Sequence, residues 1–235
     1  NAIDAVTSRE MSAVFESFMK NSQLRVAILT GAGTRFFSAG WDLTAASEGE
    51  AFESDYGVGG FGGICELKYR PKPVIVAVNG MAVGGGFEIA LAADLIVAAE
   101  HAEFFLPEAN LGLIADNATI RLPKIVPPKI AREMLISGRR MSATEAQSWG
   151  IVNQVTSTEN LMTAARELAT KICAAAPLSV AAVLELVRDL EDVSTDDAMP
   201  ILRSNETYRA AINSQDAKEG ADAYAEKRSP KWQGK

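Results

Sequence analysis

The chain has 235 residues, which is enough for one large domain or for one domain with an appended piece. Its formal net charge of -7 argues against a nucleic-acid or anionic-membrane surface, because both partners call for a basic patch. A single histidine, His101, and only two cysteines nearly exclude zinc sites and histidine-based triads. We therefore expect a cytoplasmic protein with no metal, no nucleic-acid partner and no membrane partner.

The first half of the chain predicts strands that alternate with loops and a helix. Short apolar runs, several of them ending in glycine or asparagine, indicate strands at residues 24–30, 72–80, 95–99 and 103–106. The segment "GGGFEIALAAD" predicts a helix with Phe87, Ala90 and Leu91 on one face. No internal sequence repeat stands out.

The second half begins with a helix start signal and then turns helical throughout. Ser142, with Glu145 three residues later, forms a capping box, and Gly150 then predicts a stop followed by a strand at 151–155. From Thr158 the pattern predicts helices to the end of the chain. We therefore predict an α/β core at 1–175 followed by a helical C-terminal region at 176–235.

A glycine-rich segment at residues 57–62 reads "GVGGFG" and satisfies the G-x-G-x-x-G pattern. The pattern marks dinucleotide binding only when it follows a strand and opens a helix, and this segment does neither. We interpret it as a flexible surface loop.

A second glycine run, Gly84 to Gly86, precedes a carboxylate on an apolar helix. Glycine lets backbone N–H groups approach a ligand, and a helix N-terminus adds positive potential. Glu88 then lies among apolar neighbours, where an unpaired charge would cost several kcal/mol or stay protonated. A glutamate on a solvated helix face is the simpler alternative, but three consecutive glycines favour a functional site.

Glu108 is the second unusual carboxylate, because it follows Pro107 and a run of large apolar residues. Taken alone, it is equally compatible with a solvated loop glutamate. Two such carboxylates could share a water molecule and shift each other's pKa values apart, as acid/base chemistry requires. The residues therefore make Glu88 and Glu108 candidates for an acid/base pair, and the sequence alone does not show that they meet.

Together these segments resemble the crotonase (enoyl-CoA hydratase/isomerase) superfamily over essentially the whole chain. The motifs that carry the resemblance are "NAID" (1–4), "AILTGAGTRFFSAGWDL" (27–43), "KPVIVAVNGMAVGGGFEIALAADLIVAA" (72–99), "FFLPEANLG" (104–112), "SGRRMSATEAQSWGIVNQV" (137–155) and "DAKEGADAYAEKRSPKW" (216–232). The resemblance implies a spiral of ββα units closed by a C-terminal helical region that mediates a homotrimer or a dimer of trimers. The family usually has a β-hairpin before "NAID", so we expect that hairpin to be missing here.

The resemblance also implies roles for individual residues. The backbone N–H groups of Trp41 and Gly85 fall at the oxyanion hole, and Glu88 and Glu108 fall on the two hydratase glutamates, which we assign as base and acid. The backbone N–H of Asp116 falls where the family holds the catalytic water. The loop there, "IADNATIRLP", lacks the family's Gly-Gly pair and looks one residue short, which leaves the shape of the pocket open.

Substrate contacts follow from the same resemblance. The CoA- and substrate-binding positions are Ala39, Gly40, Trp41, Asp42, Leu43, Lys227 and Arg228. The last two are a basic pair in a family tail that packs near a neighbouring subunit's ligand site, so we expect them to meet CoA phosphates there. CoA enters as part of the substrate, and no separate cofactor is expected.

The expected function is hydration or dehydration of an acyl-CoA thioester. The segments "FFSAGWDLTAASEGE" and "YGVGGFGG" are most similar to the carnitinyl-CoA dehydratase group, which interconverts carnitinyl-CoA and crotonobetainyl-CoA. A general short-chain enoyl-CoA hydratase is the alternative enzyme. RNA-binding and non-catalytic family members form another class, which the net charge of -7 and the retained glutamate pair argue against.

Overall fold

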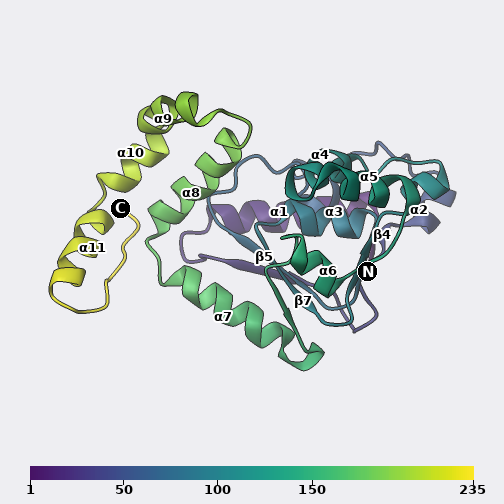
Figure 1. Cartoon of the computed structure of the whole chain (residues 1–235), viewed down its shortest axis with the longest axis horizontal. Helices are drawn as coiled ribbons and strands as arrows, with labels where there is room; N and C mark the ends of the chain where they lie inside the picture. The colour runs from purple at the N-terminus through teal and green to yellow at the C-terminus, as the bar shows by residue number, and fades with distance from the viewer.

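The computed structural model describes residues 1–235 and consists of an α/β body with an arm of C-terminal helices. The body lies on the right of Figure 1, and helices α8 to α11 form the arm on the left. The N-terminus lies within the body, far from the arm. Any site built by the first half of the chain is therefore remote from the last helices of the same chain.

The body is built from three units in which two strands, with a short third strand in the first unit, are followed by helical segments. The first unit contains β2 (Ala27–Thr30), β3 (Phe36–Ser38), β4 (Gly40–Trp41) and α2 (Leu43–Ser47). The second contains β5 (Val74–Val78), β6 (Met81–Val83) and α3 (Gly85–Ala92). The third contains β7 (Leu95–Ala99), β8 (Glu103–Phe105), the 3-10 helix η2 (Glu108–Leu111) and α4 (Asp116–Ile125). The predicted spiral of ββα units is therefore confirmed.

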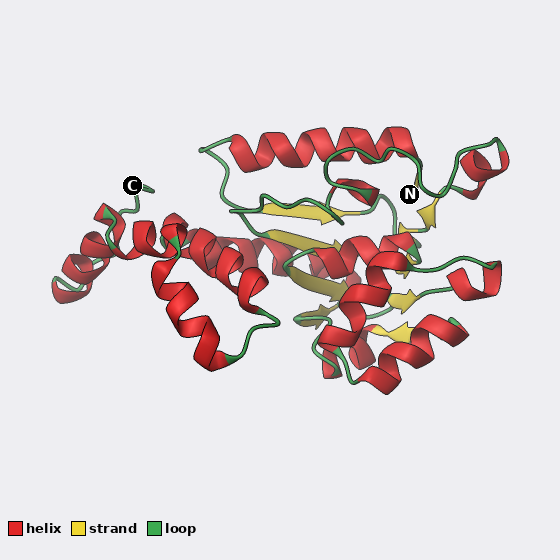
Figure 2. Ribbon diagram, turned by 90° about the horizontal axis from the view of Figure 1, so that it is seen from above, coloured by secondary structure: helices red, strands yellow, loops and turns green.

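Each unit gives its first strand to one sheet and its second strand to another. The parallel sheet has the order β10-β7-β5-β2, and the other has the order β3-β6-β8-β9 with only β9 antiparallel. Three further elements connect and extend these sheets: α5 (Pro128–Ser137), β9 (Met141–Ser142) and α6 (Ala143–Ser148). The strands of the β10-β7-β5-β2 sheet all point toward one end of the body, as Figure 2 shows.

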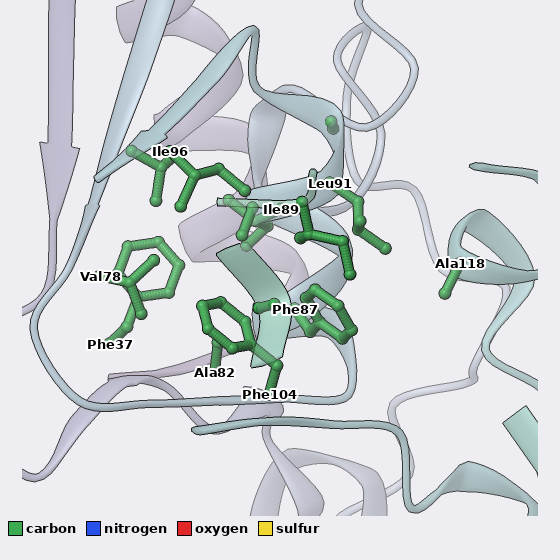
Figure 3. Packing of buried hydrophobic residues seen from close by; sticks show 14 of the residues in the cluster. Phe37, Val78, Ala82, Phe87, Ile89, Leu91, Ile96, Phe104 and Ala118 are labelled. Atoms are coloured by element: carbon green, nitrogen blue, oxygen red, sulfur yellow. The ribbon is translucent and has the colours of Figure 1, made fainter. Parts of the chain in front are cut away.

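A large apolar core of 32 buried residues holds these units together, and a second cluster of 7 covers the other face of the β10-β7-β5-β2 sheet. All five residues of β5 are fully buried, as expected for a strand covered on both faces of a parallel sheet. Phe87 on α3 and Phe104 on β8 face each other with ring centroids 5.2 Å apart, and Figure 3 shows them within the cluster. Burying each ring contributes roughly 1.5–3 kcal/mol. The residues of α3 are all buried, so this helix lies inside the body.

Helix α1 (Ala5–Lys20) packs on this core, and the glycine-rich segment 57–63 packs against α1. The N–H groups of Gly59 and Gly62 donate to the hydroxyls of Ser12 and Ser8 at 3.3 and 3.1 Å. Gly59 and Gly62 are buried. The interpretation of this segment as a flexible surface loop was therefore wrong. Its glycines let the backbone approach the helix, since a Cβ on Gly63 would lie 2.4 Å from the backbone nitrogen of Ser12.

The predicted strand at 151–155 is displaced along the chain. The observed strand is β10 (Gln154–Thr156), which pairs with β7. Ile151 and Val152 instead donate their N–H groups to the carbonyl of Ala146 at 2.9 and 3.2 Å, closing the turn after α6. The apolar run therefore begins in a helix-ending turn and becomes a strand only after it.

The C-terminal part contains the short η3 (Thr158–Asn160) and then α7 (Leu161–Cys173), α8 (Pro177–Leu190), α9 (Thr195–Ser204), α10 (Glu206–Ile212) and α11 (Gln215–Ala225). The prediction of helix to the end was wrong for residues 226–235, which run back along the arm. The buried carboxylate of Asp216 accepts from the N–H groups of Gln233 and Gly234 at 2.7 and 2.8 Å. The Trp232 indole N–H donates to the carbonyl of Ala174 at 2.7 Å. These contacts hold the tail in a non-helical path, so α11 does not continue beyond Ala225.

The arm has little interior of its own. Its separate apolar cluster contains only three buried residues, Ala182, Leu186 and Ala211. Large apolar side chains remain exposed on the same helices, among them Val183, Val187, Met199, Ile201 and Ile212.

No single helix is long and apolar enough to cross a membrane, although the bent pair 158–173 and 177–190 meets that length and composition criterion when combined.

Candidate active site

The three ββα units meet at a cavity of about 340 Å³. The segment after β3, the start of α3, residues 107–117 and the loop 52–66 all contribute to its wall. The wall is mixed in character, with the aromatic residues Trp41, Phe52, Tyr56 and Phe61 and the acidic residues Glu53, Glu66, Glu88, Glu108 and Asp116. The first residues of α2, α3 and α4 therefore line one partly acidic pocket.

Glu88 reaches this cavity from the buried helix α3. It is only 6% exposed, although every other residue of its helix is apolar or glycine. Its Oε1 accepts a hydrogen bond of 2.9 Å from the backbone N–H of Ala118. A buried carboxylate needs such a partner, since burying an unpaired charge costs several kcal/mol.

The same hydrogen bond also caps helix α4. The residue before α4 is Ala115, which has no side-chain oxygen to accept from the first-turn N–H groups. Ala118 is the third residue of that helix, so Glu88 takes the acceptor role that a serine or aspartate usually fills. A charge on the carboxylate is further favoured by the positive end of the helix dipole.

Burial nevertheless raises the pKa of Glu88 to about 7. Burial is the main cause, and the negative charges of Asp116 and Glu108 add to it, while the Ala118 N–H opposes the shift. Glu88 can therefore exchange a proton near neutral pH, which is where a general acid or base works best.

Glu108 opens the 3-10 helix η2 directly after Pro107. Burial also raises the pKa of its carboxyl group, with a further contribution from Asp116. Its Oε2 is buried and has no hydrogen-bond partner. Its Oε1 lies so close to Gly84 that a Cβ there would be 2.4 Å away. Gly84 therefore leaves room for this carboxylate beside the start of α3.

Two backbone N–H groups face the cavity beside these carboxylates. Gly85 is the first residue of α3, so its N–H has no acceptor within the helix. Trp41 pairs with Ile3 of β1 (Ala2–Ile3), but the ladder bond to the Ile3 carbonyl comes from Asp42 at 3.0 Å. Successive N–H groups of a strand point to opposite sides, so that of Trp41 is directed away from β1.

Glycine at position 40 lets the strand of Trp41 approach the start of α3. A Cβ on Gly40 would lie 2.8 Å from the nitrogen of Gly85 and 2.7 Å from the carbonyl oxygen of Val83. Gly40 also has a φ of +80°, a conformation that side chains disfavour. Two amide donors and two buried carboxylates thus share one cavity. This arrangement can stabilise a developing oxyanion and move a proton beside it.

The chain can now be compared with known proteins. The family described as enoyl-CoA hydratase/isomerase matches residues 1–235. This chain belongs to that family. Curated relatives named carnitinyl-CoA dehydratase, from Salmonella arizonae and Proteus mirabilis, are each 54% identical, with all of this chain and 91% of the relative covered.

Solved structures of the enoyl-CoA hydratase/isomerase family share the fold. An enoyl-CoA hydratase from Mycobacterium tuberculosis is 38% identical with a TM-score of 0.91 over all of this chain and 90% of that one. An enoyl-CoA hydratase from Bacillus anthracis is 31% identical with a TM-score of 0.90 over all of this chain and 91% of that one. The predicted crotonase-type architecture is confirmed by both.

Within this family fold, most of the predicted site residues line the cavity: Ala39, Trp41, Leu43, Gly85, Glu88, Glu108 and Asp116. Gly40 and Asp42 do not. Gly40 packs behind the wall, and the Asp42 carboxylate caps α2 by accepting from the Thr44 N–H at 2.8 Å. Asp116 is the first residue of α4, so its N–H also lacks an acceptor within the helix.

The basic pair of the tail is not part of the cavity of its own chain. Lys227 and Arg228 follow α11 at the end of the arm, on the opposite side of the molecule from α2 in Figure 1. Arg228 is engaged with Glu219 through two hydrogen bonds of 2.6 and 2.9 Å, and it also pairs with Glu226. Any contact of this pair with a ligand in the cavity would need a second chain.

Three contributions to the site were absent from the sequence-based prediction. They are the N–H of Ala118, the aromatic wall of Phe52, Tyr56 and Phe61, and the carboxylate of Glu50, which accepts from the Trp41 indole N–H at 2.7 Å. The missing cap before α4 was a usable signal for the first, because an uncapped helix start needs an acceptor from elsewhere. No local pattern marked the other two.

Proposed function

We propose that this protein is a CoA-thioester hydratase/dehydratase that interconverts carnitinyl-CoA and crotonobetainyl-CoA. The observation that carries the reaction type is the pair of buried glutamates on one cavity, beside the N–H groups of Trp41 and Gly85. The acyl group is proposed from the curated relatives that bear this name at 54% identity over the whole chain. CoA is part of the substrate in this scheme, and no separate cofactor takes part.

The two amide donors activate the thioester. In the proposed complex, the N–H groups of Trp41 and Gly85 donate to the thioester carbonyl oxygen, which becomes an enolate oxygen when the α-carbon gains or loses a proton. Each preorganised donor of this kind lowers a barrier by roughly 2.7–4 kcal/mol. Gly85 adds the positive potential of the α3 N-terminus, which also favours an anionic oxygen there.

The glutamate pair moves the protons. In hydration, ionised Glu88 takes a proton from water, whose oxygen bonds to the β-carbon, while protonated Glu108 supplies the proton that ends on the α-carbon. Dehydration reverses both transfers, so one water is gained or lost and the pair keeps one proton. The N–H of Ala118 favours the ionised form of Glu88, and the free Oε2 of Glu108 leaves room for a proton.

The start of α4 completes the proposed water site. Asp116 lines the cavity as the first residue of that helix, with its backbone N–H unused by the helix. We assign this N–H to hold the reacting water between the two carboxylates. The shortened loop before α4 is compatible with this role because a backbone donor does not depend on the side chain.

The remaining substrate contacts divide between two chains in the proposal. Ala39, Trp41 and Leu43 hold the CoA thioester in the cavity, and Lys227 and Arg228 of a neighbouring subunit meet the CoA phosphates. The exposed apolar side chains of the arm support a homotrimer or a dimer of trimers, because monomers seldom leave large apolar patches uncovered. Light scattering that shows a monomer at micromolar concentration would contradict this assembly.

A general short-chain enoyl-CoA hydratase is the alternative enzyme, since the solved relatives carry the name enoyl-CoA hydratase. An RNA-binding or non-catalytic protein is the alternative from a different class. The glutamate pair argues against a non-catalytic role, because placing the buried Glu88 and the part-buried Glu108 on one cavity raises the pKa of both and would only destabilise the fold if they had no function.

The deciding experiment is turnover across a panel of enoyl-CoA thioesters that includes crotonobetainyl-CoA and crotonyl-CoA. Loss of the conjugated double bond is followed by absorbance, and the product is identified by mass spectrometry. We expect the highest kcat/KM for crotonobetainyl-CoA. A preference for crotonyl-CoA would support the general hydratase instead. No turnover of any thioester, together with retention of labelled RNA on a filter, would favour the RNA-binding alternative.

A further inference from the structure

Glu50 connects two parts of the molecule that are distant in sequence. Its Oε1 accepts the indole N–H of Trp41 at 2.7 Å, and its Oε2 accepts the backbone N–H of Ala5 at 3.0 Å. Both oxygens of the carboxylate are therefore held by N–H donors. The Glu50 carboxylate is fixed in place at the nitrogen edge of the indole ring.

The helix contact of Glu50 is not needed to start that helix. The N-cap of α1 is Asp4, whose Oδ1 accepts the N–H of Thr7 at 2.7 Å. Ala5 is the first residue of α1, and its N–H could bind water at little cost. The start of α1 therefore orients the Glu50 carboxylate. The carboxylate in turn holds the indole ring of Trp41 through its N–H.

Trp41 forms an aromatic corner of the cavity with Phe52. The two rings meet edge to face with centroids 5.5 Å apart and an interplanar angle of 79°. Trp41 and Phe52 both line the cavity, whereas Glu50 does not. The carboxylate is bonded to the indole ring but lies outside the cavity wall, so its charge acts on the cavity without offering a hydrogen-bond acceptor there.

Such a corner matches one feature of the proposed acyl group. A trimethylammonium group cannot donate a hydrogen bond, so it is best held by aromatic faces and by nearby negative charge. A carboxylate that accepts the indole N–H makes the ring face more negative and adds a direct Coulomb attraction. The charge of Glu50 also reaches Tyr56 on the cavity wall, where burial, Glu50 and Asp116 raise the pKa of the phenol to about 12.

We propose that Glu50 is a specificity-determining positioning residue that makes the Trp41–Phe52 corner the binding site for the cationic head of the acyl group. The inference rests on the proposed function, because it assigns a place for the trimethylammonium group of crotonobetainyl-CoA. It predicts that the charge of Glu50 matters for cationic substrates and not for neutral ones of the same chain length.

The test compares Glu50→Gln with the wild-type protein on crotonobetainyl-CoA and on neutral crotonyl-CoA. Glutamine keeps an oxygen acceptor for the indole N–H and removes the charge. We expect kcat/KM for crotonobetainyl-CoA to fall by about 5- to 30-fold, mostly through KM, and that for crotonyl-CoA to change less than about 2-fold. Glu48→Gln is the matched control, since Glu48 is an exposed residue two positions earlier with no side-chain contact, and neither substrate should respond.

A second measurement needs no turnover. The affinities of the saturated analogues γ-butyrobetainyl-CoA and butyryl-CoA are measured by calorimetry for the wild type, Glu50→Gln and Trp41→Phe. Trp41→Phe keeps a ring and the backbone N–H but removes the indole N–H that Glu50 accepts, so the ratio of its affinities for the cationic and the neutral analogue should fall as it does in Glu50→Gln. If Glu50→Gln proves unstable in a thermal melt, Trp41→Phe provides the same comparison.

The outcomes separate two failures. If the wild-type protein hydrates crotonyl-CoA but not crotonobetainyl-CoA, the proposed acyl group is wrong, and this inference falls with it. If the wild type prefers crotonobetainyl-CoA and Glu50→Gln loses activity equally on both substrates, Glu50 is merely structural. If neither substrate responds, the corner does not hold the cation. In these last two cases the inference is overturned while the proposed function stands.

Discussion

Glu88 and Glu219 place the same side chain in opposite surroundings. Glu88 lies in the α/β body, where burial raises its pKa to about 7 and its one protein partner is a backbone N–H. Glu219 lies on the arm, where two hydrogen bonds from Arg228 lower its pKa to about 2. An ordinary glutamate has a pKa between these extremes, near 4.5.

The difference shows how the surroundings of a glutamate decide whether it can exchange a proton near neutral pH. A cationic partner stabilises the charge of Glu219 so well that the group cannot take up a proton near neutral pH. Glu88 has no cation beside it, so its protonation responds to small changes in its surroundings. The body tolerates this costly carboxylate because a fixed N–H meets it, whereas the arm uses its carboxylate to hold the tail. The predictions below test this contrast in order of expected effect.

The largest effect is expected from the neutral variants Glu88→Gln and Glu108→Gln. Each removes a group that must exchange a proton, so kcat should fall by about 100- to 10,000-fold, with affinity for a saturated acyl-CoA changed only slightly. Initial rates and calorimetry measure the two quantities. Glu10→Gln, on the exposed face of α1, is the control. Near wild-type rates in both site variants would rule out the catalytic pair.

The pH dependence of hydration should follow the raised pKa of Glu88. If Glu88 is the base, it must be ionised, so kcat/KM should fall toward tenfold per pH unit below about pH 7. The charge of Asp116 contributes to the raised pKa of Glu88, so Asp116→Asn should move this acid limb to lower pH. Rates of both proteins from pH 5 to 9 provide the measurement. An acid limb that stays at the same pH would exclude this electrostatic coupling.

Glu88→Gln should make the protein more stable at alkaline pH. The folded pKa of Glu88 is raised, so its contribution to stability is fully present below about 4.5 and is lost as pH rises through about 7. The rise in the pKa from 4.5 to about 7, at about 1.4 kcal/mol per pH unit, sets an upper limit of about 3.5 kcal/mol. Urea unfolding at fixed protein concentration should show a gain of about 1–3 kcal/mol at pH 8.5 and almost none at pH 4.5. A gain of equal size at both values would point to packing instead.

The smallest effect is expected from Glu219→Gln. The pKa of Glu219 is lowered, so its contribution to stability is present above its ordinary pKa and is lost as pH falls toward 2. The pair with Arg228 is solvent-exposed, so the thermal midpoint at pH 7 should drop only slightly, and the difference from wild type should vanish at low pH. A loss in the free energy of unfolding at pH 7 as large as the gain expected for Glu88→Gln at pH 8.5 would mean that the Glu219–Arg228 pair is buried by contact with another chain.

Much of the fold could be predicted because its signals are local. The strand at 95–99 has the bounds expected from its apolar run, and the Ser142 hydroxyl accepts from the Glu145 N–H at 3.2 Å as the capping box requires. The errors came from distant contacts. The segment 57–63 is ordered by serines of α1, and the tail after residue 225 is held by Asp216. Neither partner could be identified from the segment itself.

The residues of the site likewise divide into those that a local sequence signal predicts and those that only distant contacts reveal. Glu88 could be found because a carboxylate in an apolar helix conflicts with its neighbours, and Gly85 because it is the middle glycine of a triplet at the start of that helix. The N–H of Ala118 and the carboxylate of Glu50 could not, because a backbone donor carries no residue signature and Glu50 joins partners 9 and 45 residues away. The sequence therefore predicts which groups react, while the groups that hold them become visible only in three dimensions.

The hydrogen bond from Ala118 to Glu88 also sets a limit on how the loop before α4 can change in length. Successive residues of a helix are rotated by about 100° around its axis, so a one-residue slip in the helix itself would turn this N–H away from the carboxylate. Insertions and deletions must therefore be absorbed between Leu111 and Ala115, before the rotation begins. The angular phase of α4, and not the length of its loop, is the quantity that any redesign of this pocket has to preserve.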